Sequence, residues 1–144
     1  MNTTKIVDPV DINNLDFLAT DLLTAAAAVL PGGYESRIIG FELAAAKSRI
    51  AYFMPEPAGP RCLTSFPATA EHHDALAAAD ALAVAMLNTM PELSRVMVGL
   101  ALDEGAKLRV HARPQTGEVA AMVLIGRNLV PIGQRAIALA ATAQ

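Results

Sequence analysis

The chain has 144 residues, of which 53% are apolar and only 17% are charged, and its net charge is -3 at neutral pH. This length suits one domain with a single core, and the acidic balance excludes a general attraction to nucleic acid or to an anionic membrane. The single cysteine, Cys62, excludes an internal disulfide, and the N-terminus has one lysine with no apolar run behind it, unlike a secretory signal. We therefore expect a cytoplasmic protein.

The N-terminal third predicts an arm followed by a helix. Residues 1–13 mix Asp, Pro and Asn without periodicity, which is typical of a flexible arm. Asn13 is placed to cap a helix whose apolar residues recur at spacings of three and four: Leu15, Leu18, Leu22, Ala25 and Val29. Pro31-Gly32-Gly33 then ends the helix.

Residues 35–54 fit two structures. As strands, Ile39, Phe41 and Leu43 alternate on one side, and a second strand follows a turn near Ala46-Lys47. As a helix, the same segment also places its apolar residues on one stripe, and ELAAAK is a strong helix former. The interior Gly40 favours the hairpin, although periodicity alone does not separate the two.

A short third strand and a long helix come next. RCLTSF, between Pro60 and Pro67, is typical of a strand, and Thr69 is placed to cap a helix that runs from Ala75 to Met90. The expected inner stripe of this helix consists of Leu76, Ala79, Ala83, Met86 and Met90.

In the last third of the chain, the spacing of the apolar residues changes from that of a helix to that of a strand. Val96, Val98, Leu100 and Leu102 alternate, Asp103-Glu104-Gly105 supplies a turn, and Leu108, Val110 and Ala112 alternate again, which predicts a hairpin. A turn at 114–117 leads into EVAAMVLIG, whose lack of polar alternation is typical of a central strand. A final helix is expected from the cap at Asn128, with Pro131 in its first turn and a buried stripe that consists of Leu129, Ile132, Ala136 and Leu139.

This order of elements predicts an α+β fold. We expect an antiparallel sheet of five to six strands with three helices, in the order α-βββ-α-βββ-α, as one domain over residues 14–144 that follows the arm.

The histidines and one isolated acid are the candidate catalytic residues. They are His72, His73, Asp80 and His111. The adjacent His72 and His73 diverge by about 100° on a helix, so they do not share a face as metal ligands on one helix must. The neighbouring acids suit the first turn of a helix, where unpaired N–H groups favour them. We expect a helix start here and neither a metal nor a cofactor, and Asp80 fits the solvated edge of its helix.

Four basic or titratable residues share one face of a predicted strand. They are Lys107, Arg109, His111 and Arg113, spaced by about 7 Å. Such a stripe suits an acidic partner segment or a phosphate backbone, or else a solvated face paired with carboxylates such as Glu118. No aromatic residues interleave with it, so base stacking is not indicated. We take it as the candidate partner-binding surface, and nucleic acid ranks last.

Two families show a similar order of elements. The tail RVMVGLALDEGAKLRVHARPQTGEVAAMVLIGRNLVPIGQRAIALA, preceded by DALAAADALAVAML, resembles the back half of roadblock-type modules. The whole order, with its third strand at RCLTSF, the small size and the acidic pI, is also similar to that of dimeric chaperones of type III secretion effectors. The strand region in the first half of the chain is longer than in roadblock-type modules, and the strand EVAAMVLIG departs from the pattern of the secretion chaperones. Both resemblances imply a non-enzymatic homodimer that binds protein.

The composition agrees with that expectation. Soluble domains usually carry about a quarter charged residues, so the deficit here indicates apolar surface that a second copy or a partner covers. The alternative is a small enzyme or ligand-binding domain whose histidines and Asp80 converge on a pocket.

Overall fold

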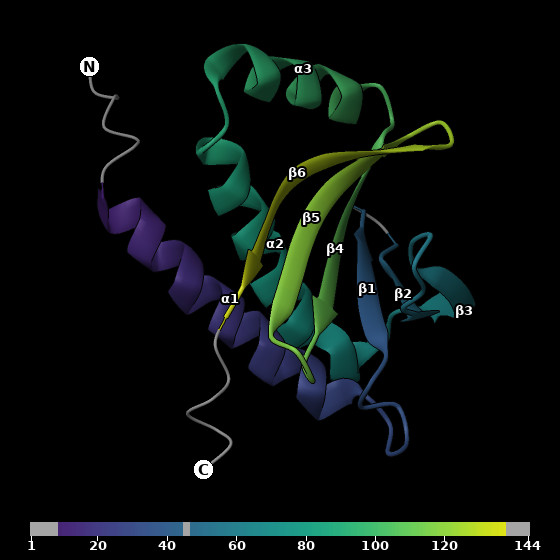
Figure 1. Ribbon diagram of the computed structural model, residues 1–144. Helices are drawn as coiled ribbons and strands as arrows, with labels where there is room; N and C mark the ends of the chain where they lie inside the picture. The colour runs from purple at the N-terminus through teal and green to yellow at the C-terminus, as the bar shows by residue number, and fades with distance from the viewer. Residues whose placement is uncertain (1–8, 45–46, 138–144) are drawn as a thin grey trace.

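The computed structural model describes residues 9–44 and 47–137. Helix α1 (Pro9–Val29) precedes three strands, β1 (Ile38–Leu43), β2 (Arg49–Met54) and β3 (Arg61–Pro67). A short 3-10 turn, η2 (Ala70–His72), leads into α2 (His73–Asn88) and α3 (Glu92–Asp103). Three further strands follow, β4 (Lys107–Arg113), β5 (Glu118–Ile125) and β6 (Asn128–Ala136) (Figure 1).

The six strands form one antiparallel sheet in the order β3-β2-β1-β4-β5-β6. The central pair, β1 with β4, joins the two halves of the chain, because Phe41 lies opposite Val110 in the register. Helices α1 and α2 pack against each other and on one face of this sheet. The predicted α+β class, with its antiparallel sheet and three helices, is confirmed.

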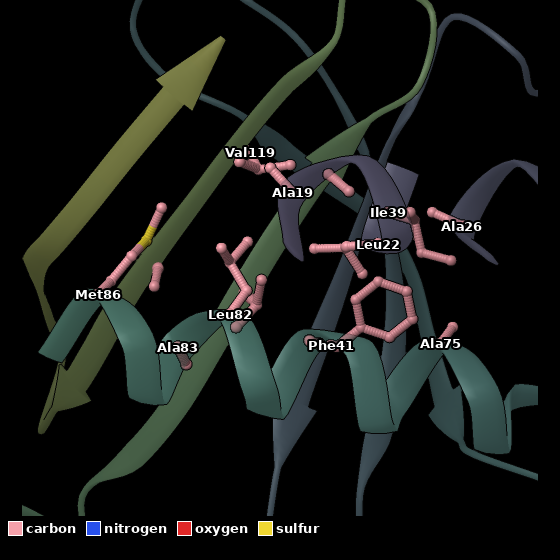
Figure 2. Packing of buried hydrophobic residues seen from close by; sticks show 14 of the residues in the cluster. Ala19, Leu22, Ala26, Ile39, Phe41, Ala75, Leu82, Ala83, Met86 and Val119 are labelled. Atoms are coloured by element: carbon pink, nitrogen blue, oxygen red, sulfur yellow. The ribbon is translucent and has the colours of Figure 1, made fainter. Parts of the chain in front are cut away.

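The core lies between these two helices and the sheet, and it is built from small residues. Ala19 and Ala26 of α1 and Ala79 and Ala83 of α2 are completely buried. Figure 2 shows larger side chains such as Leu22, Leu82 and Phe41 filling the space between the helices and the strands. Alanines at these positions let the two helix backbones approach each other closely, as their contact along the sheet requires.

The sequence correctly predicted most of the first half. Residues 38–54 form the β1–β2 hairpin rather than a helix, and β3 occupies the predicted third position. Ala46, at the predicted turn, lies outside the described residues. Helix α1 begins earlier than predicted, at Pro9, so Asn13 lies inside it and residues 9–13 belong to the helix, not to the arm. Residues 1–8 lie outside the described part.

Two elements of the second half were predicted wrongly. Residues 92–103, expected to contain a strand, form α3, and residues 128–136, expected to begin a helix, form β6. Helix α3 starts directly after Pro91 and ends before Gly105, whose φ of +103° only glycine adopts readily. The pattern Val96, Val98, Leu100, Leu102 fits a strand period, but Val96 and Leu100 also form a helical stripe with Leu93 and Met97.

Strand β6 is explained by the turn before it. Ile125 pairs with Asn128, which leaves a two-residue loop that begins at Gly126, with φ of +63°. Pro131 is tolerated because β6 is an edge strand and the register shifts beside it. Leu139, the end of the predicted helical stripe, lies outside the described residues. None of the described helices has the length and apolar content needed to cross a membrane.

Candidate functional site

The residues predicted as sites lie on two sides of the sheet. His72, His73 and Asp80 belong to the helical side, whereas the basic residues of β4 lie on the opposite face, which we call the open face. The open face is the one that points away from the core cluster formed by α1, α2 and the inward strand residues.

His72 acts as a structural residue at the start of α2. Its ring is 3% exposed, and Nδ1 accepts a hydrogen bond of 3.0 Å from the backbone N–H of Thr69. The ring packs beside Phe66, with centroids 5.9 Å apart. Glu71 and Asp74 lie in the first turns, as expected for acids at a helix start. These contacts explain His72 as a cap of the η2 turn.

His73 and Asp80 share a groove. They lie two turns apart on α2 and line a hollow of about 600 Å³ together with Ser48 and Lys107. The structure therefore brings together two of the four predicted catalytic residues. His72 points into the core region beside Phe66, and His111 lies on the open face, so neither joins this groove.

The residues of the basic stripe on β4 differ in their exposure and in their partners. Lys107 is exposed, whereas Arg109 and Arg113 are half-buried. The Nη2 atom of Arg109 lies 3.3 Å from Oε2 of Glu42 on β1, and Nε of Arg113 donates to the backbone carbonyl of Ser36 at 3.2 Å. The predicted carboxylate partner, Glu118, is not the one used by Arg109, because the register places Glu42 directly opposite.

His111 is 8% exposed, in contrast to the solvated position that the alternation predicted. Its ring stacks on Phe53 with centroids 4.6 Å apart, and the Arg109 guanidinium lies 5.8 Å from the centre of the same Phe53 ring. The two rings lie over Gly40: a Cβ there would be 2.7 Å from Cε1 of Phe53 and 3.0 Å from Cδ2 of His111. Gly40 is therefore required by this close stack.

Burial sets the charge of His111. Removal from water, together with the smaller effect of the nearby positive charge of Arg109, lowers the pKa of this imidazole from 6.5 to about 4. Its Nε2 is buried without a hydrogen-bond partner among the described residues. The ring is therefore neutral at physiological pH and stabilises the open face by packing.

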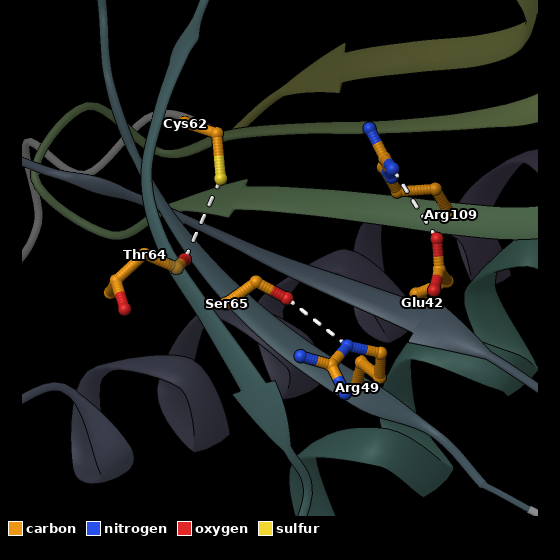
Figure 3. A network of polar contacts seen from close by, with 6 residues as sticks. All are labelled: Glu42, Arg49, Cys62, Thr64, Ser65 and Arg109. Carbon is orange, nitrogen blue, oxygen red and sulfur yellow. Dashed lines mark hydrogen bonds and ion pairs between the residues drawn. The ribbon is translucent and has the colours of Figure 1, made fainter. Parts of the chain in front are cut away.

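Small residues and polar contacts make up the rest of the open face. Figure 3 shows the ion pair between Glu42 and Arg109 and the bond from Nε of Arg49 to Oγ of Ser65, which is 3.2 Å long. The exposed thiol of Cys62 donates to the carbonyl of Thr64 at 3.6 Å. One hollow of about 430 Å³ lies at the Arg113 end, and another of about 200 Å³ lies between Arg49 and Arg109.

A second exposed surface was missed by the sequence reasoning. Helix α3 buries only Val98 and leaves four large apolar side chains exposed: Leu93, Val96, Met97 and Leu100. The spacing of these residues was the available signal, but the prediction of a strand hid it.

The described residues hold no group of three or more His, Cys, Asp or Glu side chains that would bind a metal. Comparison of the chain with protein-family models, with curated proteins and with solved structures found no match.

Proposed function

We propose that this protein is a non-catalytic, self-associating module that binds another protein. The observation that carries the proposal is the open face: a broad sheet surface, covered by neither α1 nor α2, that combines basic side chains with small and apolar ones. In addition, four of the ten large exposed apolar residues in the described part of the chain lie on α3, which supports self-association.

The charges of the open face favour an acidic partner. The strand residues there include four cations, Arg49, Lys107, Arg109 and Arg113, but only two carboxylates, Glu42 and Glu118. One carboxylate, Glu42, is already paired with Arg109. In a chain with a net charge of -3, this face is therefore a local positive region.

The shape of the open face favours a segment with apolar side chains as well. The stacked rings of Phe53 and His111 cover Gly40 at the centre of this face, and Ala120, Met122 and Leu124 on β5 continue the apolar surface beside them. An amphipathic acidic segment would place its apolar side chains on this surface and its carboxylates near the arginines. The resemblance to roadblock-type modules and to secretion chaperones agrees with this proposal.

A matched pair of peptides tests the proposal. Two fluorescent 16-residue peptides carry the same leucines, and the charged positions are all Glu in one and all Lys in the other. We expect the Glu peptide to bind at least tenfold more tightly in 50 mM salt, and its affinity to fall as salt rises. Equal binding of the two peptides, measured by fluorescence anisotropy, would contradict the proposal.

Charge-reversal variants locate the binding surface. Arg49→Glu combined with Lys107→Glu removes two cations from the open face, and it should reduce binding of the Glu peptide at least tenfold. The control, Arg95→Glu with Arg127→Glu, changes the net charge equally at α3 and at the β5–β6 turn and should leave most of the affinity intact. An equal loss in both double variants would indicate general electrostatics instead of a site.

One observation favours a second candidate function, that of a small enzyme or ligand-binding domain. The groove of about 600 Å³ places His73, Asp80, Ser48 and Lys107 around apolar residues such as Leu76, a mixture found in small-molecule sites. A ligand screen by thermal shift tests it: a hit whose stabilisation is lost in Asp80→Asn but kept in His111→Leu would favour this function.

A further inference from the structure

Helix α3 presents an apolar stripe to solvent. Leu93, Val96, Met97 and Leu100 are 72%, 50%, 62% and 59% exposed, and they occur at positions i, i+3, i+4 and i+7. Residues with this spacing lie on one side of a helix. The opposite side of α3 buries only Val98, so the larger apolar side of this helix contacts no part of the described chain closely enough to be covered.

A hollow lies near the C-terminal end of α3. Leu93 projects from the first turn of α3, and near the last turn a hollow of about 320 Å³ is lined by Ala101, Leu124 and Ile125. Ile125, at the turn end of the β5–β6 hairpin, is 41% exposed and extends the apolar surface beyond α3. One helix thus carries a projecting leucine and a hollow at opposite ends.

We infer that this surface binds a second copy of the same chain, with the two α3 helices antiparallel about a twofold axis between Val96 and Met97. In this arrangement Leu93 lies opposite Leu100 of the second copy, and Val96 lies opposite Met97. Each Leu93 then reaches the edge of the other copy's hollow. The same contacts are made twice, as in the self-complementary interfaces of twofold dimers.

The size of the surface indicates a weak pair of copies. The 12 residues of α3 form a strip about 18 Å long and about 10 Å wide, which covers only part of the roughly 800 Å² that each partner of a stable complex buries. The adjoining Ile125 enlarges this strip on both copies at once. We therefore expect an interface made of α3 together with the β5–β6 end, and a dimer that dissociates in the micromolar range.

The charges around the stripe disfavour a membrane as the occupant. Helices that lie on membrane surfaces carry Lys and Arg along their polar side. Helix α3 has a single cation, Arg95, and it lies on the packed side of the helix, while Glu92 and Asp103 mark the two ends. The stripe itself is uncharged, which suits an apolar protein surface, and the acids at its two ends disfavour an anionic lipid surface.

Sedimentation velocity on three proteins tests this inference, which rests on the self-association in the proposed function. The wild type at 50 µM should have twice the 15.1 kDa mass of one chain. Met97→Glu, which places two carboxylates beside the twofold axis, should sediment as a monomer. Phe17→Glu, at a 65% exposed apolar residue of α1, is the matched control and should remain a dimer.

Cross-linking tests the antiparallel arrangement. In a Cys62→Ser background, Met97→Cys should be linked to its copy by a bismaleimide with a span of 8 Å. Leu93→Cys should not be linked, because the two copies of position 93 are separated by seven residues, or about 10 Å, along the helices.

Three outcomes would overturn the inference. A wild type that is monomeric at 50 µM removes both the dimer and the self-association of the proposed function. A dimer that persists in folded Met97→Glu keeps self-association and rejects the α3 interface. Dissociation of both Met97→Glu and Phe17→Glu rejects it also, since the effect would not be specific to α3. Binding of the Glu peptide to the open face is measured separately and is independent of all three.

Discussion

Acid should destabilise this protein through His111. The folded protein holds the pKa of this buried imidazole at about 4, whereas an unfolded chain has a histidine pKa near 6.5. Between these values the unfolded state binds a proton that the folded state does not. Stability therefore rises with pH across this window, and the contribution of His111 is fully present above pH 6.5 and lost as pH falls to about 4.

The magnitude follows from the difference in pKa. A shift of about 2.5 units corresponds to about 3 kcal/mol, and the slope near pH 5.5 is about 1 kcal/mol per pH unit. This is a large part of the 5 to 15 kcal/mol that stabilises a typical domain. The ring is only 8% exposed, so water does not stabilise its protonated form. Its charged neighbour is Arg109, and no carboxylate of the described residues forms an ion pair with it.

Urea unfolding followed by circular dichroism at pH 7.5, 6.5, 5.5 and 4.5 measures this effect. His111→Leu keeps an apolar side chain against Phe53 and removes the titration, so the wild type should lose about 2.5 kcal/mol more than the variant over this range. His73→Gln, at an exposed histidine, is the control and should follow the wild type. Parallel pH profiles for wild type and His111→Leu would refute the assignment of the titration to His111.

Three other substitutions have expected effects on the free energy of unfolding, each measured by urea denaturation at pH 7.5. Gly40→Ala should destabilise by about 1 to 3 kcal/mol, because its Cβ would lie 2.7 Å from Phe53; an unchanged midpoint would mean that the stack over Gly40 is loose. Gly99→Ala should stabilise by up to about 1 kcal/mol, because it is an exposed helical glycine whose Cβ would meet nothing within 4 Å; a loss of stability would contradict the helical assignment of α3. His72→Ala should cost about 2 kcal/mol or more through lost packing and the lost acceptor for Thr69, whereas a solvated histidine would cost nothing.

The sequence was informative where turn residues and periodicity agree. The β4–β5 hairpin was predicted from the alternation of Leu108, Val110 and Ala112, the turn at 114–117 and the apolar run EVAAMVLIG after it, and Gly117 in this turn has φ of +80°. The β1–β2 hairpin was predicted because Gly40 argued against a helix. The structure gives the physical reason for that glycine, since Phe53 and His111 close over it, and this contact between three strands is not visible in local sequence.

The sequence predicted the wrong element where the apolar residues fit both a strand spacing and a helical spacing. Residues 93–102 satisfy a strand period through Val96, Val98 and Leu100 and a helical period through Leu93, Val96 and Leu100. Residues 128–136 have apolar residues at helical spacing, yet the two-residue turn at Gly126-Arg127 pairs them with β5. Long-range pairing decided residues 128–136, and it also placed Glu42 opposite Arg109, so neither was visible in local sequence. The α3 stripe was visible as a spacing, but the competing strand period hid it.

Residues 92–103 form a helix and not the predicted strand, and this changes the interpretation of the low fraction of charged residues in the chain. A strand there would have buried one apolar face in the sheet. The helix buries only Val98 and leaves four large apolar residues in water, which disfavours the isolated chain. Burial of the same residues against a second copy would offset that cost, while the open face lies on the other side of the core from α1 and α2 and stays available to a partner. The proposed self-association and the proposed partner binding therefore involve different residues, Met97 and Arg49 among them, and each can be tested by mutation while the other is measured.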